Sequence, residues 1–261
     1  MKYALLIGIN YRESDCELSG CINDVLKIKD ELINKFGYEE QNITLLTEDT
    51  VQKPTAQSII DHITNLVFKT VSHPNSELWI HYSGHGASVS DKNSDEADGM
   101  DEVIVPLDYE KSGIITDDTL HQLMQYLPTQ TKCICFFDCC HSGTILDLKY
   151  KYDITGSEMI DNSKSRIKAQ VFMISGCKDD QTSADFFNQL NNNWAGAMTT
   201  AFINVLNESN YQINCNNLLI KMQQYMTANH FSQIPQMTSS FHIKNDTHFC
   251  NIKKSSNSII K

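Results

Sequence analysis

The chain is 261 residues long, which is enough for one large α/β domain or two small ones with a real core. Hydrophobic residues make up 41% and charged residues 20%, values that exclude long disorder and collagen-like repeats. The 21 Lys and Arg against 32 Asp and Glu give a net charge of −11. This charge opposes nucleic-acid backbones and anionic membranes, so we expect neither as a partner.

The sequence contains no export or membrane signal. No apolar stretch approaches the roughly 18 residues of a membrane span, and the early apolar run at 4–9 has no cleavage pattern behind it. Nine cysteines is an odd number, and they are scattered without the spacing of a disulfide framework. We therefore expect free thiols in a reducing, cytoplasmic compartment.

Strand-like and helix-like segments alternate along the chain. Short apolar runs predict strands at 3–9, 43–46, 78–82, 103–105, 133–137 and 171–174. Helical spacing predicts helices at 21–36, 56–71, 119–127, 197–206 and 218–226. This alternation predicts an α/β fold with a mostly parallel sheet, helices on both faces, and functional residues beyond the carboxyl ends of the strands. We expect exposed loops at 88–101 and 149–168, within a single domain spanning 1–261.

The first candidate site follows the predicted strand 78–82, where His85 stands between Gly84 and Gly86. Flanking glycines bring nothing to a structural histidine. At a catalytic one they let substrate approach and leave the Gly86 N–H free to donate. We therefore interpret His85 as catalytic. His81, inside the strand, is better explained as a satisfied, half-buried histidine.

The second candidate site follows the strand 133–137, where Cys139 and Cys140 precede Ser142 and Gly143. A thiolate is a strong nucleophile, and a nearby histidine can take its proton and later protonate the leaving group. Spacing alone does not choose between the two thiols. We select Cys140 because it lies later in the turn, nearer the small residues. His141 is a poor base for its neighbour because adjacent side chains on extended backbone point apart.

Three alternative sites fit the residues less well. A tyrosine-phosphatase loop needs Arg six positions after its Cys, where Leu146 stands. A zinc site is disfavoured because the cysteines of 133–140 follow one strand and cannot easily converge as a tetrahedron. The acidic stretch 91–102 has Glu96 where an EF-hand needs Gly. Asp117 and Asp118 have a simple interpretation as acids at a helix N-terminus.

Seven ordered motifs resemble those of the metacaspases, a family in the caspase-like clan of cysteine peptidases. They are HYSGHG at 81–86, DCCHSG at 138–143, LSGCIND at 18–24, DGMDEVIVPLD at 98–108, GIITDD at 113–118, ISGCKDDQTSAD at 174–185 and GAMTTAFI at 196–203. The resemblance covers almost the whole chain. It implies a caspase-like fold with a large-subunit-like region at 1–148, an exposed junction at 149–168 and a small-subunit-like region at 169–261.

The resemblance also implies roles for individual residues. His85 and Cys140 would form the catalytic dyad, with the oxyanion held by the N–H groups of Gly86 and Cys140. The family cleaves after Lys or Arg through an acidic pocket. The residues matching that pocket are Cys21, Asp24, Ser83 and Asp138. Cleavage after Asp, as in caspases, is not expected, because the chain has only two arginines, Arg12 and Arg166, to hold an acidic side chain.

Many family members require Ca²⁺, and the matching ligands here are Asp101, Asp117, Asp118 and Asp147. Hard oxygen ligands from three separate segments would order the loops near the site only when the ion is bound, so we expect activation by calcium. The family can also cut itself at the junction, here 149–168. We lean towards such processing without choosing a bond, although a solvated basic loop explains the same residues.

Two departures from the family pattern stand out. Some members carry a Pro/Gln-rich prodomain, whereas this sequence begins on its first predicted strand, so we expect no recruitment through such a domain. Cys177 stands where the family more often has Ser. The resemblance implies a monomer that acts on polypeptides. The alternative is a catalytically silent caspase-like module that binds peptides or partners, against which the intact His85 and Cys140 argue.

Overall fold

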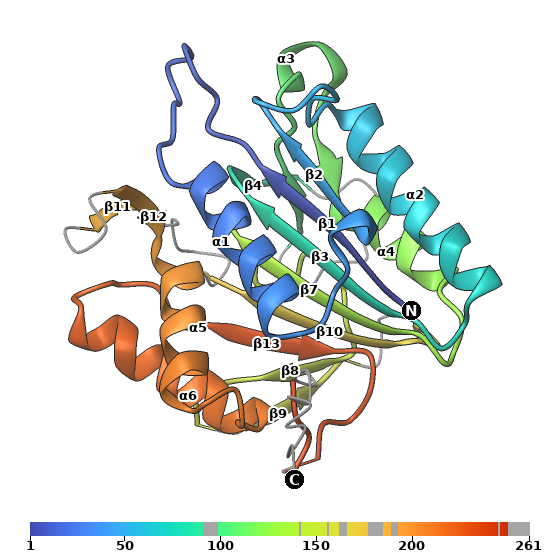
Figure 1. Ribbon diagram of the computed structural model, residues 1–261, viewed down its shortest axis with the longest axis vertical. Helices are drawn as coiled ribbons and strands as arrows, with labels where there is room; N and C mark the ends of the chain where they lie inside the picture. The colour runs from blue at the N-terminus through green and yellow to red at the C-terminus, as the bar shows by residue number, and fades with distance from the viewer. Residues whose placement is uncertain are drawn as a thin grey trace, which may run out of the picture.

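An eight-stranded sheet forms the centre of the protein, with strand order β2-β1-β3-β7-β10-β13-β8-β9 (Figure 1). The structure is a computed structural model that describes residues 1–90, 99–140, 142–155, 157–161, 166–176, 185–188, 193–244 and 246–249, with backbone alone for 185–188, 193 and 194. The strands of the central sheet are β1 (Lys2–Gly8), β2 (Ile43–Thr47), β3 (Glu77–Ser83), β7 (Lys132–Asp138), β8 (Tyr150–Tyr152), β9 (Glu158–Ile160), β10 (Gln170–Ser175) and β13 (Gln236–Ser239).

The first five strands of that order run parallel, and the last three are antiparallel to their neighbours. Two small sheets accompany the large one. They consist of β4 (Gly86–Ser90), β5 (Met100–Ile104) and β6 (Ile115–Thr116), and of β11 (Asp185–Asn188) with β12 (Asn193–Gly196). The predicted mostly parallel α/β fold is confirmed, and the predicted strand 103–105 overlaps β5, which belongs to a small sheet.

Helices cover both faces of the central sheet, as the alternating sequence pattern predicted (Figure 1). They are α1 (Cys21–Asn34), η1 (Glu40–Asn42), α2 (Ala56–Ser72), α3 (Tyr109–Ser112), α4 (Asp117–Gln125), α5 (Ala197–Glu208) and α6 (Cys215–Ala228). On β3, Trp79 packs with α1, α5 and α6, whereas Ile80 packs with α2 and α4. Successive strand residues face opposite sides, so each face of the sheet has its own hydrophobic core.

Two helices begin at glycines without a side-chain cap, whereas α2, α4 and α6 have Thr55, Thr116 and Asn214 as N-caps. The helices that begin at glycines are α1, after Gly20, and α5, after Gly196. The first N–H groups of a helix have no partner within it, so they must be satisfied from elsewhere. For α5, the partners are carboxylates of the candidate site described below.

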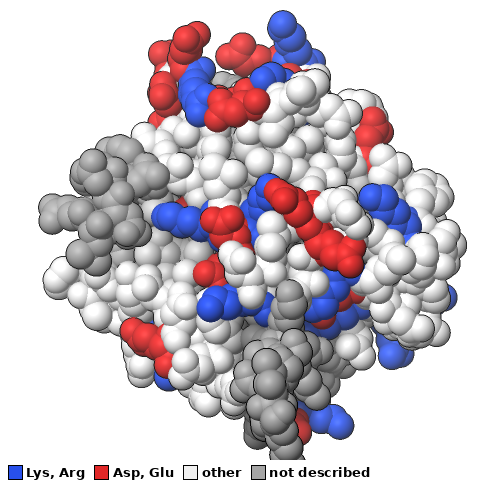
Figure 2. All heavy atoms as spheres, viewed as in Figure 1, with Lys and Arg blue, Asp and Glu red and all other residues white. Residues whose placement is uncertain are grey.

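The surface carries charges of both signs. On the face shown in Figure 2, Lys and Arg side chains are interspersed with Asp and Glu. Within the part of the chain that the structure describes, no helix combines the length and apolar character needed to cross a bilayer.

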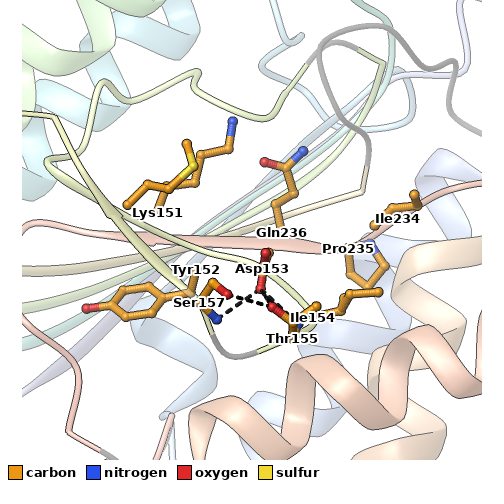
Figure 3. A pocket seen from close by; sticks show the side chains of 10 residues that line it. Lys151, Tyr152, Asp153, Ile154, Thr155, Ser157, Ile234, Pro235 and Gln236 are labelled. Carbon is orange, nitrogen blue, oxygen red and sulfur yellow. Dashed lines mark hydrogen bonds between the residues drawn. The ribbon is translucent and has the colours of Figure 1, made fainter.

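The predicted loop 149–168 is wrong in part, because it contains the hairpin of β8 and β9. The Asp153 carboxylate closes the turn by accepting bonds from Thr155 N (2.8 Å) and Ser157 N (3.0 Å), as Figure 3 shows. Across the strands, Tyr152 donates to Glu158 at 2.8 Å. The predicted loop 88–101 likewise overlaps β4 and β5, and its acidic residues 91–98 lie outside the described residues.

Candidate active site

The two predicted strand ends are neighbours in the sheet. β3 and β7 pair in parallel, with Ser83 opposite Asp138, and Gly84 N donates to Asp138 O at 3.4 Å. A methyl carbon built on Gly86 would lie only 2.1 Å from the carbonyl oxygen of Cys140. The loop carrying His85 and the turn carrying Cys140 are therefore pressed together, and only glycine fits at position 86.

The two candidate nucleophiles differ in accessibility. Cys139 is completely buried, and its sulfur would lie 3.1 Å from a methyl carbon on Gly86. Cys140 is partly exposed. A peptide bond can approach a sulfur only from solvent, so the burial of Cys139 favours Cys140 as the nucleophile. His141 lies outside the described residues.

The His85 ring is held by the loop that follows β1. Its Nε2 lies 2.6 Å from the carbonyl oxygen of Cys16. A carbonyl oxygen can only accept, so Nε2 must carry the proton in this contact. In the neutral ring Nδ1 is then the unprotonated nitrogen, the one able to take a proton from a thiol.

The four residues predicted for the acidic pocket lie at the carboxyl ends of the same strands and at the start of α1. Asp24 is fully buried and Asp138 is 3% exposed. Ser83 Oγ donates to Asp24 Oδ2 at 3.2 Å. Cys21 is buried in the first turn of α1. The structure therefore brings Asp24, Ser83 and Asp138 together, with Cys21 one helical turn from Asp24.

Two residues at the start of α5 hold the buried carboxylates of Asp24 and Asp138, a pair that we call the acidic slot. Gly196 N donates to Asp24 at 2.9 Å, while the N–H and the hydroxyl of Thr199 donate to Asp138 Oδ2 at 3.0 and 2.8 Å. A methyl carbon on Gly196 would lie 2.4 Å from Asp138 Oδ2 and 2.6 Å from Asp24 Oδ2. The two carboxylate oxygens are thus at most about 5 Å apart. When both carboxylates are ionised they repel each other, and a nearby cation relieves the repulsion.

Sequence reasoning assigned no individual role to Gly196, Thr199 or Cys16. The first two stand within the motif at 196–203. Gly196 is separated from Asp24 by 172 positions, so no local spacing could have revealed the contact. The contribution of Cys16 is a backbone carbonyl, which carries no residue-type signal.

The four predicted calcium ligands lie on three segments that touch one another. Asp101 is on β5, Asp117 and Asp118 begin α4, and Asp147 follows β7. Thr144 donates to Glu102, and His121 Nδ1 lies 2.8 Å from Leu146 O, which ties the segments together. The Asp117 carboxylate accepts from the backbone N–H groups of Glu102 (2.7 Å) and Asp118 (2.8 Å). Asp117 and Asp118 lie in the first turn of α4, at the helix start where they were predicted, but the N-cap itself is Thr116.

The donor set is chemically right for calcium, because carboxylate oxygens are its preferred ligands. The distances between these side chains are less favourable. Within the described ranges, no three His, Cys, Asp or Glu side chains are gathered closely enough to hold a metal ion.

Comparison with known proteins identifies the family. The model of the metacaspase peptidase C14 domain matches residues 2–149. Metacaspase-1 of Meyerozyma guilliermondii is 36% identical over 92% of this chain and 69% of its own, and Metacaspase-1 of Schizosaccharomyces pombe is 35% identical over 92% and 67%. The chain belongs to the metacaspase family of cysteine peptidases.

Solved structures confirm the caspase-like fold of this family member. A Geobacter sulfurreducens protein matches with a TM-score of 0.68 and 22% identity, covering 95% of this chain and 96% of that one. Caspase-1 of Spodoptera frugiperda matches with a TM-score of 0.56 and 12% identity, covering 91% and 85%. At these identities the likeness concerns the fold alone.

His81 lies on the same face of β3 as Ser83, two residues below the acidic slot. The prediction of a half-buried, satisfied histidine is wrong. His81 is fully buried, and neither ring nitrogen has a hydrogen-bond partner among the described residues. Its ring stacks on Phe136, with centroids 4.9 Å apart and planes at 8°. Burial lowers the pKa of His81 to about 3, so the ring is neutral at physiological pH.

A separate pocket of about 660 Å³ lies between the hairpin β8–β9 and the segment before β13 (Figure 3). It is lined by residues such as Lys151, Met159, Pro235 and Gln236. None of the predicted site residues of this metacaspase lines it. Cys177 lies outside the described residues.

Proposed function

We propose that this metacaspase is an endopeptidase that cleaves polypeptides after Lys or Arg, with Cys140 as nucleophile and His85 as general base and acid. One observation carries the proposal. The His85 loop and the Cys140 turn meet at adjacent strand ends, beside the buried carboxylates of Asp24 and Asp138. A thiol and an imidazole supply the chemistry, and the paired carboxylates supply the preference for a cation.

In the first half of the proposed reaction, the basic side chain of the substrate enters the slot and places its carbonyl carbon next to Cys140. The Cys140 thiol gives its proton to His85 Nδ1, and the sulfur forms a bond to the carbonyl carbon. The oxyanion accepts hydrogen bonds from the N–H groups of Gly86 and Cys140. His85 then protonates the amine as the C–N bond breaks, which leaves a thioester on Cys140.

In the second half, water attacks the thioester and gives a proton to His85. The C–S bond breaks, His85 returns the proton to the Cys140 sulfur, and the carboxylic acid product leaves. The contact of Nε2 with Cys16 O supports this role, because it keeps Nδ1 available in both halves.

Calcium activation is part of the same proposal. Asp101, Asp117, Asp118 and Asp147 would hold the ion, whose charge would draw their three segments together. The loop after β7, which carries Asp147, is continuous with the Cys140 turn. Ordering of this loop is the proposed way in which calcium affects activity.

We further propose that the chain acts as a cytoplasmic monomer on polypeptides, without nucleic acid or membranes, and that the junction 149–168 can be cut by the peptidase itself. The basic residues there are Lys149, Lys151, Lys164, Arg166 and Lys168. Lys151 lies within β8, where pairing with β13 protects the backbone. Lys164 lies outside the described residues. No bond is assigned.

Turnover of fluorogenic peptides ending in Arg, Lys or Asp tests the proposal, with calcium or a chelator, for the wild type and Cys140→Ala. We expect hydrolysis of the Arg and Lys peptides with calcium, little hydrolysis with the chelator, and none by Cys140→Ala. Hydrolysis that is unaffected by the chelator would refute calcium activation and leave the proposed peptidase activity standing. Absence of turnover under every condition would refute the peptidase and favour the peptide-binding module.

A further inference from the structure

Two buried tyrosines meet directly beneath the His85 loop. Tyr11 follows β1 and Tyr82 lies in β3, and their hydroxyl oxygens are 3.0 Å apart. Tyr11 is 2% exposed and Tyr82 is fully buried. Tyr11 also has a left-handed backbone with φ of 52°, an unusual conformation for a bulky residue. Such a conformation persists only where the surrounding contacts determine it.

The two hydroxyl groups hold the backbone of His85. His85 N donates to Tyr11 Oη at 3.0 Å, and Tyr82 Oη donates to the His85 carbonyl at 2.7 Å. On the other side, Tyr11 Oη donates to Val105 O at 2.6 Å, and Val105 N donates to Tyr82 Oη at 3.2 Å. The His85 carbonyl also accepts directly from Val105 N at 3.1 Å. Both polar backbone groups of His85 are thus held by the phenols, and Val105 belongs to the same network.

The ring of Tyr11 also contacts the His85 imidazole. The two ring centroids are 4.7 Å apart, with planes at 39°. Together with the bond from Nε2 to Cys16 O, this contact restricts the rotation of the imidazole. A ring held by a stacking partner and a carbonyl acceptor keeps one nitrogen directed away from both.

Tyr11 and Tyr82 also explain why glycine stands before His85. A methyl carbon on Gly84 would lie 2.7 Å from Tyr82 Oη and 2.9 Å from Tyr11 Oη. Gly84 thus leaves room for the tyrosine hydroxyls, as Gly86 leaves room for the Cys140 carbonyl. Burial raises the pKa of both phenols far above the usual value, so they remain neutral donors over the working pH range.

We propose that Tyr11 and Tyr82 are positioning residues that fix the backbone and ring of His85 so that Nδ1 faces Cys140. The inference rests on the proposed function, because it assigns the tyrosines a task in the same proton transfer. It predicts that loss of either hydroxyl affects the chemical step more than substrate binding.

The test compares Tyr11→Phe and Tyr82→Phe with Tyr38→Phe as a matched control. Tyr38 is 3% exposed and donates to Glu77 at 3.1 Å, at the opposite end of β3. Each variant loses one buried tyrosine hydroxyl, but only the first two lose it beneath His85. We expect kcat to fall roughly tenfold in Tyr11→Phe and Tyr82→Phe with KM nearly unchanged, and both constants to stay at the wild-type level in Tyr38→Phe.

A second measurement needs no substrate. The rate of Cys140 alkylation by iodoacetamide is followed against pH by mass spectrometry of the peptide that contains Cys140. We expect the midpoint of this curve to move to higher pH in His85→Ala, and part of the way in Tyr11→Phe and Tyr82→Phe, because a misplaced imidazole stabilises the thiolate less.

These measurements distinguish failure of the positioning role from failure of the His85–Cys140 dyad. If His85→Ala moves the curve while both tyrosine variants match Tyr38→Phe, the positioning role is refuted and the dyad stands. If His85→Ala matches the wild type, the dyad is refuted and the positioning role with it. A kcat loss in the tyrosine variants that is equalled by Tyr38→Phe would also refute positioning, because general destabilisation would explain it.

Discussion

Replacing Asp24 by asparagine removes one negative charge from the acidic slot and keeps the shape of the side chain. Asp24 accepts from Gly196 N through both oxygens, at 3.1 and 2.9 Å, so the amide oxygen of asparagine can take either place. The amide NH₂ can then donate to Ser83 Oγ, which now donates to the carboxylate. We therefore expect Asp24→Asn to fold, with a change in unfolding free energy of about 1 kcal/mol or less.

The cost to substrate recognition should be much larger. Two unit charges about 4 Å apart at an effective dielectric constant of about 20 attract by about 4 kcal/mol. Loss of that attraction corresponds to roughly a thousandfold in kcat/KM. This is an upper value, because Asp138 keeps its charge on the other side of the slot.

The assay is the ratio of kcat/KM for two peptides that differ only in arginine or its neutral analogue citrulline before the scissile bond. The ratio should be high in the wild type and much lower, but still above one, in Asp24→Asn, because Asp138 remains. Asp61→Asn is the matched control, because Asp61 is exposed on α2, on the opposite face of the sheet. If Asp24→Asn kept the wild-type ratio, the slot would not be the site that recognises the basic side chain.

Three further predictions concern the same region. Gly196→Ala should raise KM for Arg peptides at least tenfold, because the added methyl would lie 2.4 Å from Asp138 Oδ2, whereas an unchanged KM would show that the slot is not occupied by substrate. Cys139→Ala should keep measurable turnover and Cys140→Ala should lose it, and the reverse result would exchange the nucleophile. The pKa of His81 is about 3 in the fold against 6.5 for the free side chain, so the unfolded chain binds more protons between these values and stability should fall with decreasing pH through that window. Between pH 7 and pH 5 this contribution is about 2 kcal/mol. Urea unfolding at these two pH values should therefore show a smaller loss of stability in acid for His81→Phe than for the wild type, and an equal loss would contradict the burial of a neutral imidazole.

The sequence predicted the long elements because each has a periodic apolar pattern of its own. The strands β1, β3, β7 and β10 and the helices α1, α2 and α5 lie where these patterns indicated. The placement of His85 and Cys140 at neighbouring strand ends follows from the parallel order of the sheet. Sequence patterns can therefore place these two residues near each other without knowledge of long-range contacts.

The elements that were missed are short and depend on pairing with distant segments. β8 and β9 have three residues each in a polar, lysine-containing stretch, and β8 is fixed by its pairing with β13. Their apolar pattern is too short to be told from a loop. His81 is predicted to be half-buried within its strand, whereas its ring is fully buried and stacks on Phe136 of β7.

The site residues that were missed also depend on contacts between distant parts of the chain. Asp24 and Asp138 came from the family resemblance, but the groups that orient them, Gly196 N and Thr199, come from the far end of the chain. Tyr11 is part of a loop with no regular pattern, and its relation to His85 exists only in three dimensions. Residues that touch the reacting atoms stand in recognisable motifs, whereas residues that hold them in place do not.

The most direct test of the account is covalent labelling by a peptidyl-arginine acyloxymethyl ketone, with the modified residue located by mass spectrometry. The account predicts one thioether on Cys140, formed much more slowly in His85→Ala and in Asp24→Asn. Labelling of Cys139, or labelling of Cys140 at the wild-type rate in His85→Ala, would contradict the claim that an imidazole and a thiol share a proton at the ends of β3 and β7.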